Sequence, residues 1–144
     1  MPTAKWSTPG TASNNLAGTA LDGLAAAATS AFLTGYANGT ALDLYAGLLI
    51  NLGSIAPTSG ATITVRVFTS VNGTAPDNTA SLGGGDAYTV PLTTTTSAKT
   101  VVVPMVRLYP GTIYLAVTNN SGVALSSTAG SNTVVLVPYD EASN

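Results

Sequence analysis

The chain has 144 residues, of which 7% are charged, with a formal net charge of -2 and neither Cys nor His. The length fits a single domain with a real core. The missing Cys and His exclude disulfides, thiolate metal sites and catalytic sites of the Ser-His-Asp or Cys-His type. The few cations are too scattered to form a phosphate-binding stripe, which argues against nucleic acid as a partner: Lys5, Arg66, Lys99 and Arg107.

The chain begins with a segment, residues 1–15, that reads as an extended N-terminal arm. Pro9, Gly10 and the run Ser13-Asn14-Asn15 favour turns and coil, and the segment shows no apolar period. At full extension the arm would reach about 50 Å, far enough to contact a neighbouring molecule. Trp6 is the only Trp. We expect it to pack either on the chain's own body or on a neighbouring subunit.

The segment after the arm predicts at most one short helix, near residues 20–26. Thr19 and Asp22 resemble a capping box, with Asp in place of the usual Glu. Gly18 and Gly23 disfavour a longer helix, because glycine lowers helix stability.

A strand is predicted at residues 30–37, and the tight-turn signal Asn38-Gly39 follows it. The run 41–52 then alternates, and Leu49 is the one apolar residue outside the apolar parity. That parity contains Leu42, Leu44, Ala46, Leu48, Ile50 and Leu52. A period of two predicts a strand with one buried face. We therefore expect residues 30–37 and 41–52 to pair as an antiparallel hairpin.

The next predicted strand covers residues 61–71, where Ile63, Val65 and Val67 alternate with polar residues. The turn stretch 53–60 is too long for a tight hairpin, and we expect it to cross from one sheet to another. Neither strand hides its apolar face alone, so the rest of the chain must supply an opposing layer.

The second half of the chain predicts several short strands separated by turns. Residues 72–85 form a long loop, which is expected to be mobile or to contact a partner. Pro91 indicates an edge strand, and Pro104 indicates a bulge, an edge or a break. The strands expected here cover residues 86–92, 99–109, 112–118, 123–127 (a weak one) and 132–139.

About eight short strands punctuated by Gly, Pro and Asn predict an all-β fold. The pattern is typical of an antiparallel β-sandwich of jelly-roll or Greek-key type. The expected organisation is the arm at residues 1–15, one sandwich domain at residues 16–139 and a polar tail at residues 140–144.

Few residues are candidates for chemistry. Asp77 and Asp86 flank one Gly-rich loop, where paired carboxylates would serve calcium binding or glycoside hydrolysis, but loop Asp residues are usually turn formers. A Ser-Lys pair would need Lys99 buried beside a serine, and its polar neighbours indicate a solvated charge instead. We predict no catalytic, cofactor-binding or metal-binding residue, and we predict that the protein is not an enzyme.

Six tyrosines are the other candidates for a site: Tyr36, Tyr45, Tyr88, Tyr109, Tyr114 and Tyr139. Gathered on one face, they would form a sugar-binding platform or a subunit interface. The alternative is that each covers a strand edge singly.

The uncharged composition also bears on partners. A surface with few charges offers little repulsion between molecules, which favours a protein that works in an assembly over a plain monomer with a Thr-rich surface. No basic region followed by an apolar core begins the chain, and no apolar run approaches about 18 residues. We therefore expect neither a signal peptide nor a membrane partner.

Three stretches together resemble small virion proteins of tailed bacteriophages, those that decorate or cement the capsid or form related head and tail fittings. The stretches are Thr19-Ala20-Leu21-Asp22-Gly23-Leu24-Ala25, Asn38-Gly39-Thr40-Ala41-Leu42-Asp43-Leu44-Tyr45 and Pro57-Thr58-Ser59-Gly60-Ala61-Thr62-Ile63. Val71-Asn72-Gly73-Thr74 and Pro76-Asp77 follow, so the resemblance covers roughly residues 15–80.

The resemblance implies a non-enzymatic β-sandwich on the exterior of a phage capsid, made in the cytoplasm of the host bacterium and often trimeric. Its partners would be the lattice of the major capsid protein and other copies of itself. Lys5 and Trp6 in the arm, Pro57 in the 53–60 turn and Asp77 in the 72–85 loop are the expected contact residues. The alternative is a tail or fibre adhesin that binds carbohydrate.

Overall fold

The computed structural model describes residues 5–70, 72–74 and 85–142, and this part of the chain is an antiparallel β-sandwich without a helix. Its strands are β1 (Lys5–Trp6), β2 (Tyr36–Ala37), β3 (Tyr45–Ile55), β4 (Thr62–Ser70), β5 (Asp86–Pro91), β6 (Ser97–Arg107), β7 (Thr112–Asn120), β8 (Thr133–Tyr139) and β9 (Glu141–Ala142). One sheet has the order β2-β7-β4-β5 and the other the order β6-β3-β8. The all-β sandwich predicted from the sequence is confirmed.

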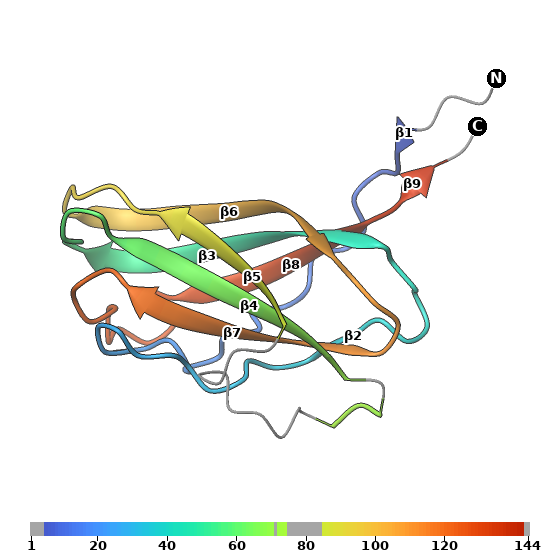
Figure 1. The fold of residues 1–144 in the computed structure, drawn as a ribbon, viewed down its shortest axis with the longest axis horizontal. Helices are drawn as coiled ribbons and strands as arrows, with labels where there is room; N and C mark the ends of the chain where they lie inside the picture. Colours follow the sequence, from blue (N-terminus) through green and yellow to red (C-terminus); the bar gives the residue numbers. More distant parts are fainter. Residues whose placement is uncertain (1–4, 71, 75–84, 143–144) are drawn as a thin grey trace.

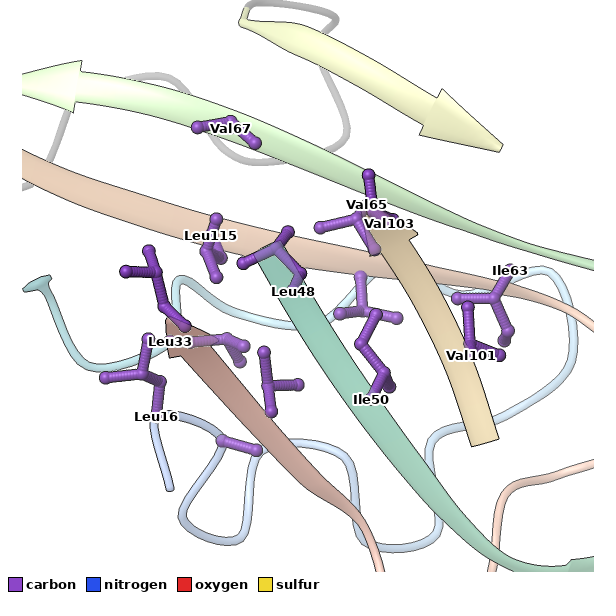
Figure 2. Close-up of a cluster of buried hydrophobic side chains, with 14 of the residues drawn as sticks. Leu16, Leu33, Leu48, Ile50, Ile63, Val65, Val67, Val101, Val103 and Leu115 are labelled. Carbon is purple, nitrogen blue, oxygen red and sulfur yellow. The ribbon is translucent and has the colours of Figure 1, made fainter. Parts of the chain in front are cut away.

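The core lies between the two sheets, where alternate residues of each strand point inward. Ala46, Leu48, Ile50 and Leu52 of β3 are buried, as the period of two predicts. Figure 2 shows the side chains of Leu48 and Ile50 gathered with those of β4 and β7. The partners on those strands are Ile63, Val65, Val67, Ile113, Leu115 and Val117. The chain crosses from one sheet to the other between β3 and β4, as expected.

The hairpin predicted between residues 30–37 and 41–52 does not form. Tyr36 of β2 pairs with Ile113 of β7, whereas β3 pairs with β6 and β8 in the other sheet. The buried side chain of Asn38 causes the difference. Its Nδ2 donates to the carbonyl oxygens of Asp43 (2.9 Å) and Tyr109 (3.1 Å), and its Oδ1 accepts from the Asp43 N–H (2.9 Å). This network holds residues 38–43 as a wide connection between the sheets.

Two leucines of the predicted apolar face are exposed as a result. Leu42 and Leu44 precede β3 in this connection and are 52% and 49% exposed, so their predicted burial is wrong. Leu42 also has a positive φ of 56°, which is unfavourable for a residue with a large side chain.

The predicted strand at residues 30–37 is regular only at Tyr36–Ala37. Upstream, the N–H groups of Ala27, Ser30 and Leu33 donate to carbonyls of β7 at Asn119, Val117 and Leu115. Three residues of this segment therefore match two residues of β7, a rise of about 2.2 Å per residue, which is too contracted for a regular strand. The segment covers the edge of β7 and pairs with it at an isolated bridge between Thr29 and Thr118 instead of in a continuous ladder.

The predicted helix near residues 20–26 is replaced by consecutive turns. Gly23 (φ 69°) and Ala27 (φ 60°) have left-handed conformations that interrupt a right-handed helix. The Leu24 carbonyl accepts from the Leu125 N–H (3.0 Å) and from Nδ2 of the buried Asn119 (2.9 Å). Groups distant in the sequence thus form hydrogen bonds with a backbone carbonyl that would bond within the segment if it were a helix.

The prolines mark the sheet edges as predicted. β5 ends at Pro91 and is an edge strand, and β6 is an edge strand that carries a bulge. The bulge lies where Ala46 pairs with Val106 and Leu48 with Val103, which leaves Pro104 in the shift of register. The weak strand predicted at residues 123–127 does not form.

Candidate interaction surfaces

The middle of the outer face of the three-stranded sheet β6-β3-β8 is apolar, between a polar end with Asn51 and an end with Tyr45 and Arg107. Leu49 of β3 lies between Val102 of β6 and Val135 of β8, and Gly47 lies opposite Val137. Residues directly opposite on one face of a sheet contact each other, so these side chains form one continuous surface. Val102 and Met105 are 54% and 51% exposed and Leu49, Val135 and Val137 are partly exposed, so the described part of the chain leaves this surface partly open. We call Leu49, Val102, Met105, Val135 and Val137 the apolar face.

The outer side of the other sheet is covered in part by the chain itself. Phe68 is buried there with Ala116, and Phe32 packs on it edge to face with ring centroids 5.0 Å apart. Tyr114 lies beside Phe32, and its hydroxyl donates to the Gly73 carbonyl (2.7 Å). The two outer faces of the sandwich therefore differ in how far the chain covers them.

A groove beside a pair of stacked tyrosines borders the apolar face. Tyr45 and Tyr139 stack with their centroids 6.0 Å apart, and the Tyr139 hydroxyl donates to the Pro104 carbonyl (2.9 Å). Burial, followed by the charge of Tyr45, raises the pKa of Tyr139. The groove beside this pair has a volume of about 360 Å³ and is lined by Ser7, Pro9, Pro104, Met105 and Tyr139. The arm, β6 and β8 thus meet at one surface.

A second, smaller cavity of about 200 Å³ is lined by residues of β4, β5 and β6 and their flanks. The Arg107 guanidinium lies over the Tyr109 ring, 5.3 Å from its centroid. Asp86 and Thr69 also line the cavity. An aromatic ring beside a guanidinium and a carboxylate can stack on a sugar and bind its hydroxyl groups.

The six tyrosines do not form one platform. Tyr36, Tyr88 and Tyr114 belong to one sheet, and Tyr45 and Tyr139 belong to the other. Among them the Tyr36 hydroxyl donates to Asp43 Oδ2 (3.1 Å). Burial, this hydrogen bond and the charge of Asp43 raise the pKa of Tyr36 to about 12.

Lys99 is buried, with 7% of its surface exposed, so the prediction of a solvated charge is wrong. Its Nζ donates to Oγ1 of Thr93 (3.1 Å), to Oγ1 of Thr95 (3.0 Å), to the Thr95 carbonyl and to Oγ of Ser97 (3.0 Å). The three N–H donors of the ammonium group are thus shared among four oxygen acceptors. The arrangement therefore anchors the connection between β5 and β6 and places Lys99 beside Ser97.

Residues 7–15 of the arm lie along the free edge of β8, and Leu16 directly after the arm continues the same row of contacts. Four N–H groups of residues 7–16 donate to alternate carbonyls of the C-terminal segment: Ser7 to Asp140 (2.7 Å), Gly10 to Pro138, Ser13 to Leu136 and Leu16 to Val134 (2.8 Å each). Three arm residues match two strand residues, as on the edge of β7. The Leu16 carbonyl also accepts from the Thr34 N–H (2.9 Å), so the two edge segments meet. Figure 2 shows Leu16 and Leu33 at this border of the core.

Three arm side chains accept hydrogen bonds from backbone N–H groups of β8 and its flank. Asn15 Oδ1 accepts from the Val134 N–H (3.0 Å), Ser13 Oγ from Leu136 (2.9 Å) and Ser7 Oγ from Asp140 (2.8 Å). The remaining residue of β8 that faces the arm is Pro138, which has no N–H to donate. The arm residue opposite Pro138 is Gly10, which has no side chain to accept a hydrogen bond. A Cβ on Gly10 would lie 3.1 Å from Pro138 Cγ. The arm and β8 are therefore matched residue by residue.

The structure does not bring the expected contact residues together. Lys5 and Trp6 form β1, which pairs with Glu141 and Ala142 of β9 beyond one end of the sandwich (Figure 1). Pro57 is buried in the connection between β3 and β4, at the opposite end. Asp77 lies outside the described residues.

The apolar face could have been predicted from strands that are apolar at both parities, a feature that the simple alternation of apolar and polar residues does not reveal. Leu49 breaks the alternation of β3, and the runs Val101-Val102-Val103 and Val134-Val135-Leu136-Val137 are apolar at both parities. A strand that is apolar at both parities is typical of a sheet covered on both faces.

Within the described residues there is no group of three or more acidic side chains that would hold a metal ion. In the same part of the chain no helix has the length and hydrophobicity to span a bilayer. No family model, curated protein or solved structure matches the chain.

Proposed function

We propose that this protein is a non-enzymatic virion protein of a tailed bacteriophage, which binds the exterior of the capsid and stabilises the shell. The observation that carries the proposal is the apolar face, a partly open and uncharged surface on a sheet whose opposite side already forms the core. Large exposed apolar surfaces mark contacts with other macromolecules.

The sheet edges favour contact through this face. The arm covers the edge of β8, and β6 carries a bulge at Pro104 together with the inward-pointing Lys99. Bulges, prolines and inward charges are the devices by which edge strands avoid pairing with other chains. Contact with the capsid lattice through the face of the sheet is therefore favoured over pairing of a lattice strand with the sheet edges.

The proposed mechanism is mass action. A protein that binds only the assembled lattice of the major capsid protein stabilises that lattice by its binding free energy. Many copies on one shell, joined by contacts between copies in a homotrimer, gain avidity without strong individual contacts. No catalytic step is required, and the proposed location is the capsid exterior of a virion assembled in the host cytoplasm.

The test compares two variants that add the same charge to opposite sheets. Val102→Glu places a carboxylate on the apolar face, and Thr89→Glu places one on an exposed position of β5. We expect the first to lose binding to expanded shells and the second to bind like the unmodified chain, measured by co-sedimentation and by cryo-EM of the particle. Equal binding of both variants contradicts the role of this face, and an unmodified chain that does not bind shells contradicts the function.

The cavity at Arg107 and Tyr109 favours one other function, a tail or fibre adhesin that binds carbohydrate. A glycan array separates the two, because a capsid-binding protein should give no signal. A signal that Tyr109→Ala abolishes would support the adhesin.

A further inference from the structure

The arm is held to the body by polar contacts that bury little of it. Residues 8–12 are exposed, and the arm first enters the core at Leu16. The segment on the edge of β7 has the same three-to-two spacing, but it buries Ser30, Leu33 and Asn38. The arm is therefore the edge segment that can leave without opening the core.

The contacts of the arm with β8 are also specific. The hydrogen bonds between the arm and β8 require side-chain acceptors at Ser7, Ser13 and Asn15, and the fit requires that Gly10 has no side chain. Among peptide segments that add to a sheet edge, backbone hydrogen bonds supply affinity and the side-chain positions supply specificity. The segment that β8 accepts is thus this arm, from the same chain or from another copy.

We propose that β8 accepts residues 7–15 of a second copy, so that copies of the chain are linked by exchange of their arms. Every contact made within one chain is available between two copies, because exchange of an identical element preserves the interactions. The far end of the arm continues into β1, which pairs with β9 beyond the end of the sandwich and away from its own core (Figure 1). The inference concerns contacts between copies and does not depend on where the assembly resides.

The lack of cysteine in the chain allows a direct test with introduced thiols. A Cβ at position 10 would lie 3.1 Å from Cγ and 3.9 Å from Cδ of Pro138, so the two side-chain positions adjoin, and a double variant tests whether a disulfide can bridge them. Gly10→Cys and Pro138→Cys are therefore made in separate full-length chains, which are mixed and oxidised. The matched control pairs Gly10→Cys with Ala98→Cys, an exposed position on β6.

Arm exchange predicts a yield of disulfide-linked dimer about tenfold or more above that of the control pair, since docking holds the thiols at a high effective concentration. The double variant G10C/P138C shows whether the geometry permits the bond. If the double variant closes only within one chain and the mixture gives no more dimer than the control, the arm stays on its own body and the proposal is overturned.

A second measurement uses the unmodified chain, in case a substitution disturbs docking. Isotopically heavy and light copies are mixed and examined by native mass spectrometry. We expect mixed dimers or larger oligomers, and their loss in S13A/N15A, which removes two acceptors for β8. A chain that is monomeric at all concentrations overturns the proposal. Shell binding, measured with Val102→Glu, tests the proposed function separately from arm exchange.

Discussion

The Nζ of Lys99 lies 3.0 Å from the Oγ of Ser97, on the inward side of the edge strand β6. Lys99 shares its parity with the buried Val101 and Val103. An edge strand with an inward charge resists pairing with a second strand, since pairing would trap that charge. The contact therefore serves both the local connection and the solubility of the edge.

Replacing Lys99 by Met tests this role, because Met retains an apolar stem and removes the ammonium. Hydrogen bonds to charged groups are worth about 1.5–3 kcal/mol, and water can reach the exposed acceptors in the variant. We expect the free energy of unfolding in urea to fall by about 1–3 kcal/mol and aggregation on heating to increase. Ser97→Ala removes one of the acceptors and should cost less. Unchanged stability of the Met variant would show that the ammonium is not an anchor.

Neighbouring leucines on β3 provide a matched comparison of the two sides of one sheet. Leu48 is buried in the core and Leu49 lies on the apolar face. Leu48→Ala should lower the free energy of unfolding by about 2–5 kcal/mol, whereas Leu49→Ala should cost about 1 kcal/mol or less, as expected for a cross-strand contact. Only Leu49→Ala should weaken shell binding while the fold is retained. Equal losses of stability would contradict the assignment of the faces.

Gly10 should be intolerant of a side chain, because its Cβ would lie 3.1 Å from Pro138 Cγ. Gly10→Ala is expected to loosen the arm, so that hydrogen exchange at the N–H groups of Ser13 and Leu136 accelerates while the core amides stay protected. Gly39→Ala is the control, since nothing lies within 4 Å of a Cβ at that position. Slow exchange in both variants would show that the arm adapts to the added methyl group.

Tyr36 predicts a dependence of stability on alkaline pH. The pKa of its hydroxyl is raised from 10.0 to about 12 by burial and by Asp43. The folded chain holds this proton more tightly than the unfolded chain, so the contribution is complete below pH 10 and is lost as the pH rises toward 12.

The variant Tyr36→Phe isolates this effect, because it removes one hydroxyl and changes no other titratable group. At pH 8 the unmodified chain should be more stable by about 1 kcal/mol, the value of one hydrogen bond. The difference in the free energy of unfolding should then shrink between pH 10 and 12. A constant difference across this range would show that the pKa of Tyr36 is not raised.

The sequence by itself determined the fold class and the inward faces of the main strands. The alternation at Ile63, Val65 and Val67 is a local property of neighbouring residues, and it predicts burial without knowledge of the partner strand. The positions of Pro91 and Pro104 likewise indicate edges and a bulge, because proline lacks an N–H for the ladder. The composition also excludes chemistry that depends on His or Cys side chains, whatever fold the chain adopts.

Only the tertiary structure decided how the strands and edge segments are matched. The sequence indicates a turn at Asn38. In the structure its side chain donates a hydrogen bond to the carbonyl of Tyr109, 71 residues away, and this contact keeps the two segments of the expected hairpin apart. The acceptors for β8 come from Ser13 and Asn15, more than a hundred residues earlier in the chain. Such pairings depend on which distant groups meet once the core has formed, and hydrogen-bonding side chains have no period that reveals their partners.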